Sequence, residues 1–301
     1  MKKVLILGGT GYIGTNLAIY LSEFYDITVT GRRNLNVILQ KYSKIKFKSL
    51  QLSDRGELKS IVKHFDIFVL LIPNRQPNQV NKILDDDLSE IIEPTEYLFN
   101  LLSQENKKLV FASTGGAVYG DSQGKISFES DICKPINQYG KYKLRLEESL
   151  TSVQKQNQFN ADILRISNPY GGHFNHYFTS GFVNTVLTKI KNKSILSIWG
   201  DGLQVRDFIH ILDVCECIRR TFEIKGFNLM NIGTGIGYSL IEVFELISKV
   251  NKSTLDLFFN YDYVEKVPYN VLSTAKSKEI LGYSPKLDLN SGIELEKLNE
   301  V

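Results

Sequence analysis

The stretch that decides the fold is Val4-Leu5-Ile6-Leu7-Gly8-Gly9-Thr10-Gly11-Tyr12-Ile13-Gly14, near the N-terminus. Its four apolar residues predict a buried strand, and an amphipathic helical pattern begins within its glycines. The glycines allow a tight turn with close approach of backbone N–H groups to a ligand, and a helix N-terminus favours a pyrophosphate. Strand, loop and helix in this order are typical of a dinucleotide-binding loop. We expect contacts to the dinucleotide from Gly8, Gly11, Tyr12, Ile13 and Gly14.

Short apolar runs alternate with helical patterns through the first half of the chain. The runs are Val4–Leu7, Ile27–Thr30, Ile45–Leu50, Ile67–Ile72, Lys108–Ser113 and Asp162–Ile166, and the helical patterns fall around 12–24, 55–63, 86–104 and 138–155. Strands that alternate with helices predict a parallel sheet covered on both faces. Six of them predict a doubly wound α/β fold with its ligand at the carboxyl ends of the strands.

This rhythm ends after Asn168-Pro169-Tyr170-Gly171-Gly172. The later patterns predict a helix around 178–191, strands near Ile195–Trp199 and 205–211, and helices near 212–222, 239–250 and 275–281. We therefore expect a nucleotide-binding domain over residues 1–168. We expect a smaller, mixed region over 169–301, the candidate substrate-binding region, to pack on it and to be partly interleaved with it.

Composition excludes several classes of function. The chain has 301 residues, 43% of them hydrophobic, and a formal net charge of +3 that is spread along the sequence, which argues against a nucleic-acid partner. Its three cysteines form no metal or redox motif, and no metal site is expected. The apolar run at the N-terminus is too short for a signal sequence or a membrane span. These features predict a cytoplasmic protein with no membrane partner.

A tyrosine and a lysine stand four positions apart in Tyr139-Gly140-Lys141-Tyr142-Lys143. On a helix, this spacing places Tyr139 and Lys143 on one face. A nearby positive charge stabilises a phenolate, so Lys143 is expected to lower the pKa of Tyr139. A tyrosine tuned in this way acts as a general acid or base near neutral pH.

The choice of cofactor depends on the end of the second strand, Val29-Thr30-Gly31-Arg32-Arg33. An acidic residue there would bind the ribose 2′-hydroxyl and favour NAD, but the turn has none. Arg32 and Arg33 instead suit the 2′-phosphate of NADP, or form a solvated basic turn beside the adenine. Both NAD and NADP stay open.

Taken together, these motifs resemble the extended short-chain dehydrogenase/reductase family, in its NAD-dependent epimerase/dehydratase branch, with UDP-glucose 4-epimerase-like proteins nearest. The resemblance covers most of the chain. Its further segments are Phe111–Gly120, which looks like the strand end that carries an active-site Ser or Thr, Leu164–Gly171, Trp199–His210, Asn231–Gly235 and Ile280–Pro285.

The resemblance implies a Rossmann domain and a redox cycle at C4 of a sugar. Tyr139 would take the proton from the sugar hydroxyl while the nicotinamide accepts the hydride, and Lys143 would bind the nicotinamide ribose. Thr114 or Ser113 would bind the same sugar oxygen. Asn168, Trp199 and Arg206 are expected to contact the nucleotide diphosphate or its base. The resemblance also implies a homodimer formed through helices 86–104 and 138–155, and a place in surface polysaccharide biosynthesis.

Some positions depart from the family pattern. Glycine follows Thr114 where the catalytic hydroxyl often stands, and Tyr263 occupies the place of a second diphosphate-binding arginine. These departures concern the substrate more than the fold. We expect a 4-epimerase of UDP-hexoses or UDP-N-acetylhexosamines. An NADP-dependent reductase of a keto-sugar nucleotide is the alternative, and a non-catalytic nucleotide-binding regulator is a further one.

Overall fold

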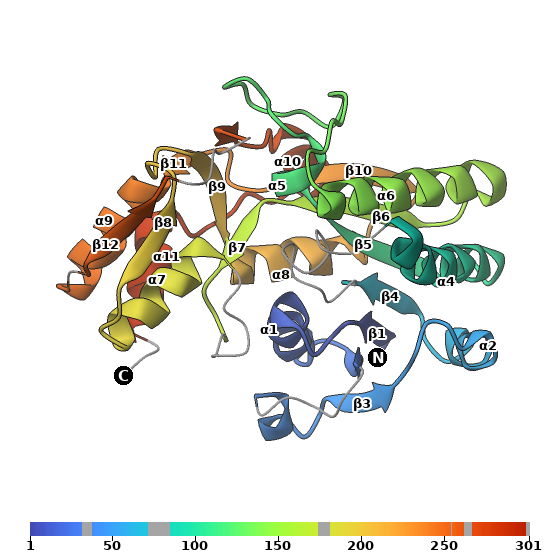
Figure 1. Cartoon of the computed structure of the whole chain (residues 1–301). Helices are drawn as coiled ribbons and strands as arrows, with labels where there is room; N and C mark the ends of the chain where they lie inside the picture. The colour runs from blue at the N-terminus through green and yellow to red at the C-terminus, as the bar shows by residue number, and fades with distance from the viewer. Residues whose placement is uncertain (32–37, 72–84, 174–180, 254, 262–266, 299–301) are drawn as a thin grey trace.

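A computed structural model describes residues 1–31, 38–71, 85–173, 181–253, 255–261 and 267–298 (Figure 1). Arg32, Arg33 and Tyr263 lie outside these ranges. Seven parallel strands form the main sheet in the order β10-β6-β5-β4-β1-β2-β3. In chain order they are β1 (Lys3–Leu7), β2 (Asp26–Gly31), β3 (Lys46–Ser49), β4 (Ile67–Leu70), β5 (Lys108–Thr114), β6 (Ala161–Ile166) and β10 (Phe227–Ile232). The doubly wound α/β fold is confirmed.

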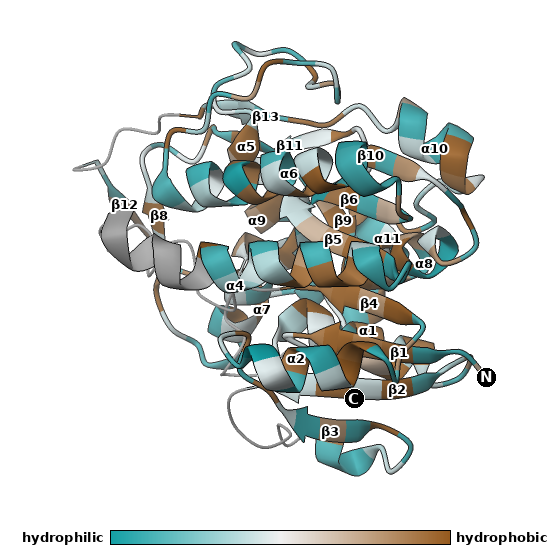
Figure 2. Ribbon diagram, turned by 90° about the vertical axis from the view of Figure 1, so that its right-hand side faces the viewer, coloured by the Kyte–Doolittle hydropathy of each residue, from teal (hydrophilic) through white to brown (hydrophobic). Residues whose placement is uncertain are grey.

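Helices cover both faces of this sheet. One face packs on α1 (Tyr12–Leu21), α8 (Ile211–Thr221) and α10 (Ala275–Leu281), and the other on α2 (Arg55–Val62), α4 (Asp85–Gln104) and α6 (Gln138–Asn157). Alternate residues of β1 serve the two layers: Val4 and Ile6 face the first, Leu5 and Leu7 the second. Figure 2 shows the brown strands at the centre and the teal outer sides of α2, α4 and α6. This burial on both faces explains the continuous apolar runs in the sequence.

The seventh strand, β10, comes from the second half of the chain and was not predicted. It pairs in parallel with β6, so the orange strand lies beside the green ones in Figure 1. Two asparagines interrupt its apolar pattern. Asn228 donates to Asp162 Oδ1 at 2.7 Å, and Asn231 accepts the Tyr119 hydroxyl hydrogen bond at 2.6 Å. Their polar side chains are satisfied inside the fold, which period-two hydrophobicity does not reveal.

The C-terminal region forms two small sheets and a separate core. β9 (Val205–His210) pairs with β7 (Asn168–Tyr170), β11 (Gly237–Ser239) and β13 (Tyr269–Asn270), while β8 (Leu196–Trp199) pairs with β12 (Leu257–Asn260). The helices are α7 (Phe182–Lys191), α9 (Leu240–Asn251) and α11 (Leu289–Leu298). The short η1 (Leu39–Lys41) and α5 (Gly115–Val118) belong to the first region. The division at residue 168 stays a prediction.

The two regions meet at Gly171-Gly172. Both glycines have positive φ, 81° and 69°. The Tyr12 hydroxyl donates to Gly171 O at 2.7 Å, and Asn16 Oδ1 accepts from His173 N at 2.8 Å. On the other side, Gly172 N donates to Glu296 Oε1 at 2.8 Å. These bonds connect the first helix after the glycine loop with α11, near the end of the chain.

Gly172→Ala is expected to destabilise the protein more than Gly226→Ala does. Both glycines have positive φ, which costs an L-residue about 1–2 kcal/mol. A methyl group at Gly172 would also meet Asn16 Oδ1 at 2.4 Å and Ile211 Cγ2 at 2.5 Å, whereas nothing lies within 4 Å at Gly226. Overpacking adds about 1–3 kcal/mol. Urea unfolding of the two variants measures the difference, and equal losses would contradict this account.

Candidate active site

The glycine loop follows β1 as predicted. Gly8 turns the chain with φ 84°, and Gly11 N donates to Gly8 O at 3.1 Å before α1 begins. Gly14 packs so closely that a Cβ would lie 2.5 Å from Gly9 Cα. Gly11 is the N-cap of α1, without a side-chain cap or an acidic residue in the first turn. The loop therefore presents backbone N–H groups and a helix dipole with no competing carboxylate there, which fits a pyrophosphate.

Tyr12 and Ile13 contribute to this loop mainly as packing residues. The Tyr12 side chain is buried and its hydroxyl is bound to Gly171 O, and burial raises the pKa of this phenol well above its usual value. Ile13 packs against the core beside α1. Any contact of Tyr12 with a phosphate therefore comes from its backbone.

Tyr139 and Lys143 lie one turn apart in the first half of α6. The helix begins after Asn137, whose Oδ1 caps Gly140 N at 2.8 Å. Lys143 is 2% exposed, its Nζ donates to Ala112 O at 2.8 Å, and it lies 4.9 Å from the centre of the Phe111 ring. The amine is thus held against the carboxyl end of β5.

Burial, not charge, dominates the titration of this pair. It lowers the pKa of Lys143 from 10.5 to about 7, opposed by the nearby Glu147 carboxylate. It also raises the pKa of Tyr139 to about 12, the reverse of the direction expected from sequence. The cause is desolvation of the phenol, which disfavours the charged phenolate.

The two hydroxyl candidates of β5 have different surroundings. Ser113 Oγ donates to Glu147 Oε1 and is buried. Thr114 ends the strand and precedes α5, which its hydroxyl does not cap. A Cβ on Gly116 would lie 3.7 Å from Thr114 Oγ1 and 3.8 Å from Asn168 Oδ1. The structure thus brings Thr114 and Asn168 to one place, while Ser113 faces α6.

The glycine after Thr114 has a packing reason. A Cβ on Gly115 would meet Leu272 Cδ1 at 2.4 Å and Arg165 O at 3.1 Å. Asn270 Nδ2 also donates to Gly115 O at 3.0 Å. The segment from β13 to Leu272 therefore occupies the space that a side chain at position 115 needs, and the hydroxyl stands one residue earlier.

The substrate-side candidates lie in the small sheets. Asn168 Nδ2 donates to Asp207 O at 2.9 Å, and Arg206 Nη1 donates to Val205 O at 2.8 Å. Asn168 lies in β7 and Arg206 in β9, and these two strands pair in parallel. Trp199 ends β8 in the other small sheet and is 54% exposed.

Asp207 supports this region from within. Its carboxylate accepts hydrogen bonds from Thr234 N at 2.9 Å, Thr234 Oγ1 at 2.8 Å and Gly235 N at 3.0 Å. Burial raises the pKa of Asp207, and these donors oppose the rise. The residue thus fixes the loop after β10 against β9.

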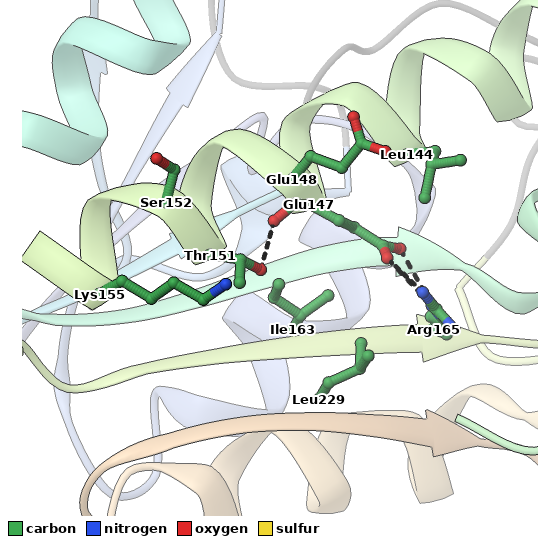
Figure 3. Close-up of a pocket in the computed structure, with 9 residues that line it drawn as sticks. All are labelled: Leu144, Glu147, Glu148, Thr151, Ser152, Lys155, Ile163, Arg165 and Leu229. Carbon is green, nitrogen blue, oxygen red and sulfur yellow. Dashed lines mark hydrogen bonds and ion pairs between the residues drawn. The ribbon is translucent and has the colours of Figure 1, made fainter. Parts of the chain in front are cut away.

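Sequence reasoning missed a buried ion pair behind Lys143. Glu147 lies one turn further along α6, and Arg165 Nη2 and Nε donate to its Oε2 at 2.7 and 3.0 Å. A groove of about 350 Å³ leads to this pair along α6, with Ile163 and Leu229 opposite Lys155 (Figure 3). An arginine inside the apolar run of β6 was the available signal, because a buried charge needs a partner.

The described part of the chain contains neither a cluster of metal ligands nor a helix that could span a membrane. Within those ranges, no three or more His, Cys, Asp or Glu side chains gather as metal ligands would. None of the described helices combines the length and the apolar character needed to cross a bilayer.

Replacing Lys143 by Met is expected to make stability less dependent on pH. The folded-state pKa of about 7 lies below the usual 10.5, so the unfolded chain binds more protons in this window and wild-type stability rises with pH through it. The advantage of Lys143→Met over wild type is therefore greatest below pH 7. It shrinks by about 2–3 kcal/mol between pH 6 and 9. Urea unfolding at both pH values measures this. The exposed Lys141→Met is the matched control, and a pH-independent advantage would contradict the prediction.

Comparison with known proteins places this geometry in a family. A model of the NAD dependent epimerase/dehydratase family matches residues 4–233. A putative UDP-glucose 4-epimerase of Methanocaldococcus jannaschii is 28% identical over 97% of this chain and 96% of its own length. A dTDP-4-dehydro-6-deoxyglucose reductase of Escherichia coli is 30% identical over 97% and 95%.

The fold comparison agrees. The crystal structure of a UDP-glucose 4-epimerase of Thermotoga maritima with UDP-glucose superposes with a TM-score of 0.90 and 24% identity, covering 98% of this chain and 97% of its own. A UDP-glucuronic acid 4-epimerase of Bacillus cereus, in complex with UDP-glucuronic acid and NAD, gives 0.87 and 21% over 98% and 97%. On its sequence and its fold, the chain belongs to the NAD dependent epimerase/dehydratase family.

Proposed function

We propose that the protein is a nucleotide-sugar 4-epimerase that acts on UDP-hexoses or UDP-N-acetylhexosamines with a bound nicotinamide cofactor. The observation that carries the proposal is the placement of Tyr139 and Lys143 on one face of α6, next to the end of β5 that bears Thr114. The family and the named relatives support the same reaction class.

Three groups would handle the proton at the sugar hydroxyl. Tyr139 would remove it as a phenolate and later return it, and Thr114 would hold the oxygen by a hydrogen bond. Lys143 as an ammonium would favour the phenolate. The glycine loop would hold the cofactor phosphates. When bound, the oxidised nicotinamide ring supplies a positive charge and the hydride acceptor for the C4 carbon.

Asn168 and Arg206 would hold the substrate diphosphate while the sugar turns. Asn168 Oδ1 lies near the Thr114 hydroxyl, as their common proximity to Gly116 indicates. Arg206 stands at the start of β9, beside β11 and β13. Because an epimerase must let the sugar rotate, firm contacts belong on the nucleotide side and few on the ring.

A keto-sugar nucleotide reductase is the second candidate, favoured by the 30% identity to the E. coli reductase along almost the whole chain. The two functions differ in what happens to the cofactor, since net reduction consumes NADPH or NADH and epimerisation consumes neither. The purified protein is offered UDP-, GDP- and dTDP-sugars with NAD or NADP. Interconverted C4 epimers support the proposal. Steady NADPH consumption on a 4-keto sugar, with no epimer from any donor, overturns it.

Tyr139→Phe is expected to lower turnover at least about 100-fold, because the variant has no proton to exchange. The phenylalanine ring keeps the packing of the tyrosine ring against the core, so the fold and the binding of the cofactor should change little. Turnover assays and isothermal titration with NAD measure the two effects. A variant that keeps its rate removes Tyr139 from the mechanism.

Thr114→Val should reduce kcat, whereas Thr114→Ser retains most of it, because serine keeps the hydroxyl and valine keeps the volume. Removal of one hydrogen bond to the reacting oxygen costs about 10-fold to 100-fold. Steady-state kinetics of both variants make the comparison. If valine and serine behave alike, the hydroxyl of residue 114 has no part in the reaction.

The dimer also stays a proposal. Subunits would pair through α4 and α6, whose mutual packing covers the second face of the sheet. Light scattering on the purified protein measures the mass, and a monomer at micromolar concentration contradicts it.

A further inference from the structure

Three side chains lie at four-residue spacing along the inner face of α6: Tyr139, Lys143 and Glu147. Glu147 is 3% exposed, so its carboxylate has left water almost completely. Burial of an unpaired charge costs several kcal/mol, and the surroundings of Glu147 must offset that cost. The proposed mechanism uses the first two residues and leaves the third without a role.

The carboxylate of Glu147 joins β5 and β6 to α6. Arg165 from β6 donates two hydrogen bonds to Oε2, and Ser113 from β5 donates to Oε1. Figure 3 shows Glu147 reaching down from the helix to Arg165 on the strand. Ser113 and Arg165 are themselves opposite one another in the strand register. Both oxygens of Glu147 are therefore bound: Oε2 by Arg165, and Oε1 by Ser113 together with Arg165 Nε at 3.3 Å.

The same strand end holds Lys143. Ala112, which accepts the Lys143 Nζ hydrogen bond, directly precedes Ser113, and Thr114 directly follows it. A shift of Ser113 would therefore also move the carbonyl that binds Lys143 and the hydroxyl of Thr114. Three consecutive residues of β5 thus bind Lys143, bind Glu147 and carry the candidate catalytic hydroxyl, in that order.

The charges around Lys143 form a short series. Tyr139 and Glu147 face it from α6, the Phe111 ring and the Ala112 carbonyl from β5, and beyond Glu147 lies Arg165. The Tyr119 ring covers Arg165 at 4.8 Å. Glu147 pairs with Arg165 and lies one helical turn from Lys143, so its negative charge acts on both cations. Loss of that charge would disfavour the ammonium twice, by removing an attraction and by exposing a repulsion.

We propose that Glu147 is a positioning residue of the active site: it favours the charged form of Lys143 against burial and fixes the end of β5 that carries Thr114. It touches neither substrate nor cofactor, and it acts through Lys143 and Ser113. The first role concerns the protein alone. The kinetic consequence also rests on the proposed function.

The direct test is the titration of Lys143 by NMR in protein labelled with ¹³C at lysine Cε, with the signal assigned by its loss in Lys143→Met. In Glu147→Gln the midpoint is expected to fall by about 1 pH unit or more. Glu148→Gln, an exposed neighbour on the same helix, leaves the midpoint unchanged. A folded Glu147→Gln protein with the wild-type midpoint overturns the proposal.

Glu147→Asp keeps the charge and the pairing with Arg165, and serves if the glutamine variant does not fold. Its carboxylate retreats by one methylene, so the Lys143 midpoint is expected to fall by a few tenths of a unit. Aspartate that leaves the midpoint unchanged overturns the proposal as well.

The kinetic arm separates the two proposals. In Glu147→Gln the alkaline limb of the kcat profile should move to lower pH together with the NMR midpoint, while KM for the sugar nucleotide changes less than twofold. A purely structural role would lower kcat equally at every pH, and that result rejects the kinetic part. If wild-type protein turns over no sugar nucleotide but the NMR shift occurs, the proposed function fails and the role of Glu147 stands.

Discussion

Burial of the seven-stranded sheet on both faces is the constraint from which the site follows. Each parallel strand must be followed by a crossing segment that returns the chain to the same edge, and the crossings that are helices cover the faces. The carboxyl ends of all the strands then lie on the same side of the sheet. Gly8 after β1 and Thr114 at the end of β5 are thereby placed on that side, although they are far apart in sequence. The chemistry is concentrated where the strands stop, and the apolar layers hold it there.

Two buried carboxylates inside this fold, those of Glu147 and Asp207, have partners from distant parts of the chain. The Glu147–Arg165 pair and the Asp207 carboxylate each replace lost hydration with hydrogen bonds from neighbouring elements. One ties α6 to the main sheet, and the other ties β9 to the loop after β10. Such groups add little net stability over apolar packing, but a shifted strand would leave them unpaired. They therefore favour one register over its alternatives.

Local patterns predicted most of the main sheet and the helical spacing of Tyr139 and Lys143. The Tyr139 and Lys143 spacing is a property of one helix, so the sequence was sufficient for it. The edge strand β10 was not predicted, because Asn228 and Asn231 break its apolar pattern and their hydrogen-bond partners come from distant segments. Long-range pairing of this kind is invisible in a single sequence.

The sequence also misjudged the environment of the pair. A lysine near a tyrosine suggested a lowered phenol pKa, but the depth of burial is set by tertiary packing and reverses the sign. Equally, Ser113 and Thr114 were indistinguishable as adjacent hydroxyl residues. Their separation depends on which side of β5 each faces, and on a carboxylate that lies 34 positions from Ser113 in sequence.

The close approach of Gly115 and Leu272 couples two positions that are far apart in the sequence. A side chain at 115 has no room while leucine occupies 272, and a smaller residue at 272 leaves a void while glycine occupies 115. Moving the hydroxyl one residue along the strand therefore requires both substitutions, with a less stable intermediate whichever comes first. We therefore expect related chains to show the two positions covarying.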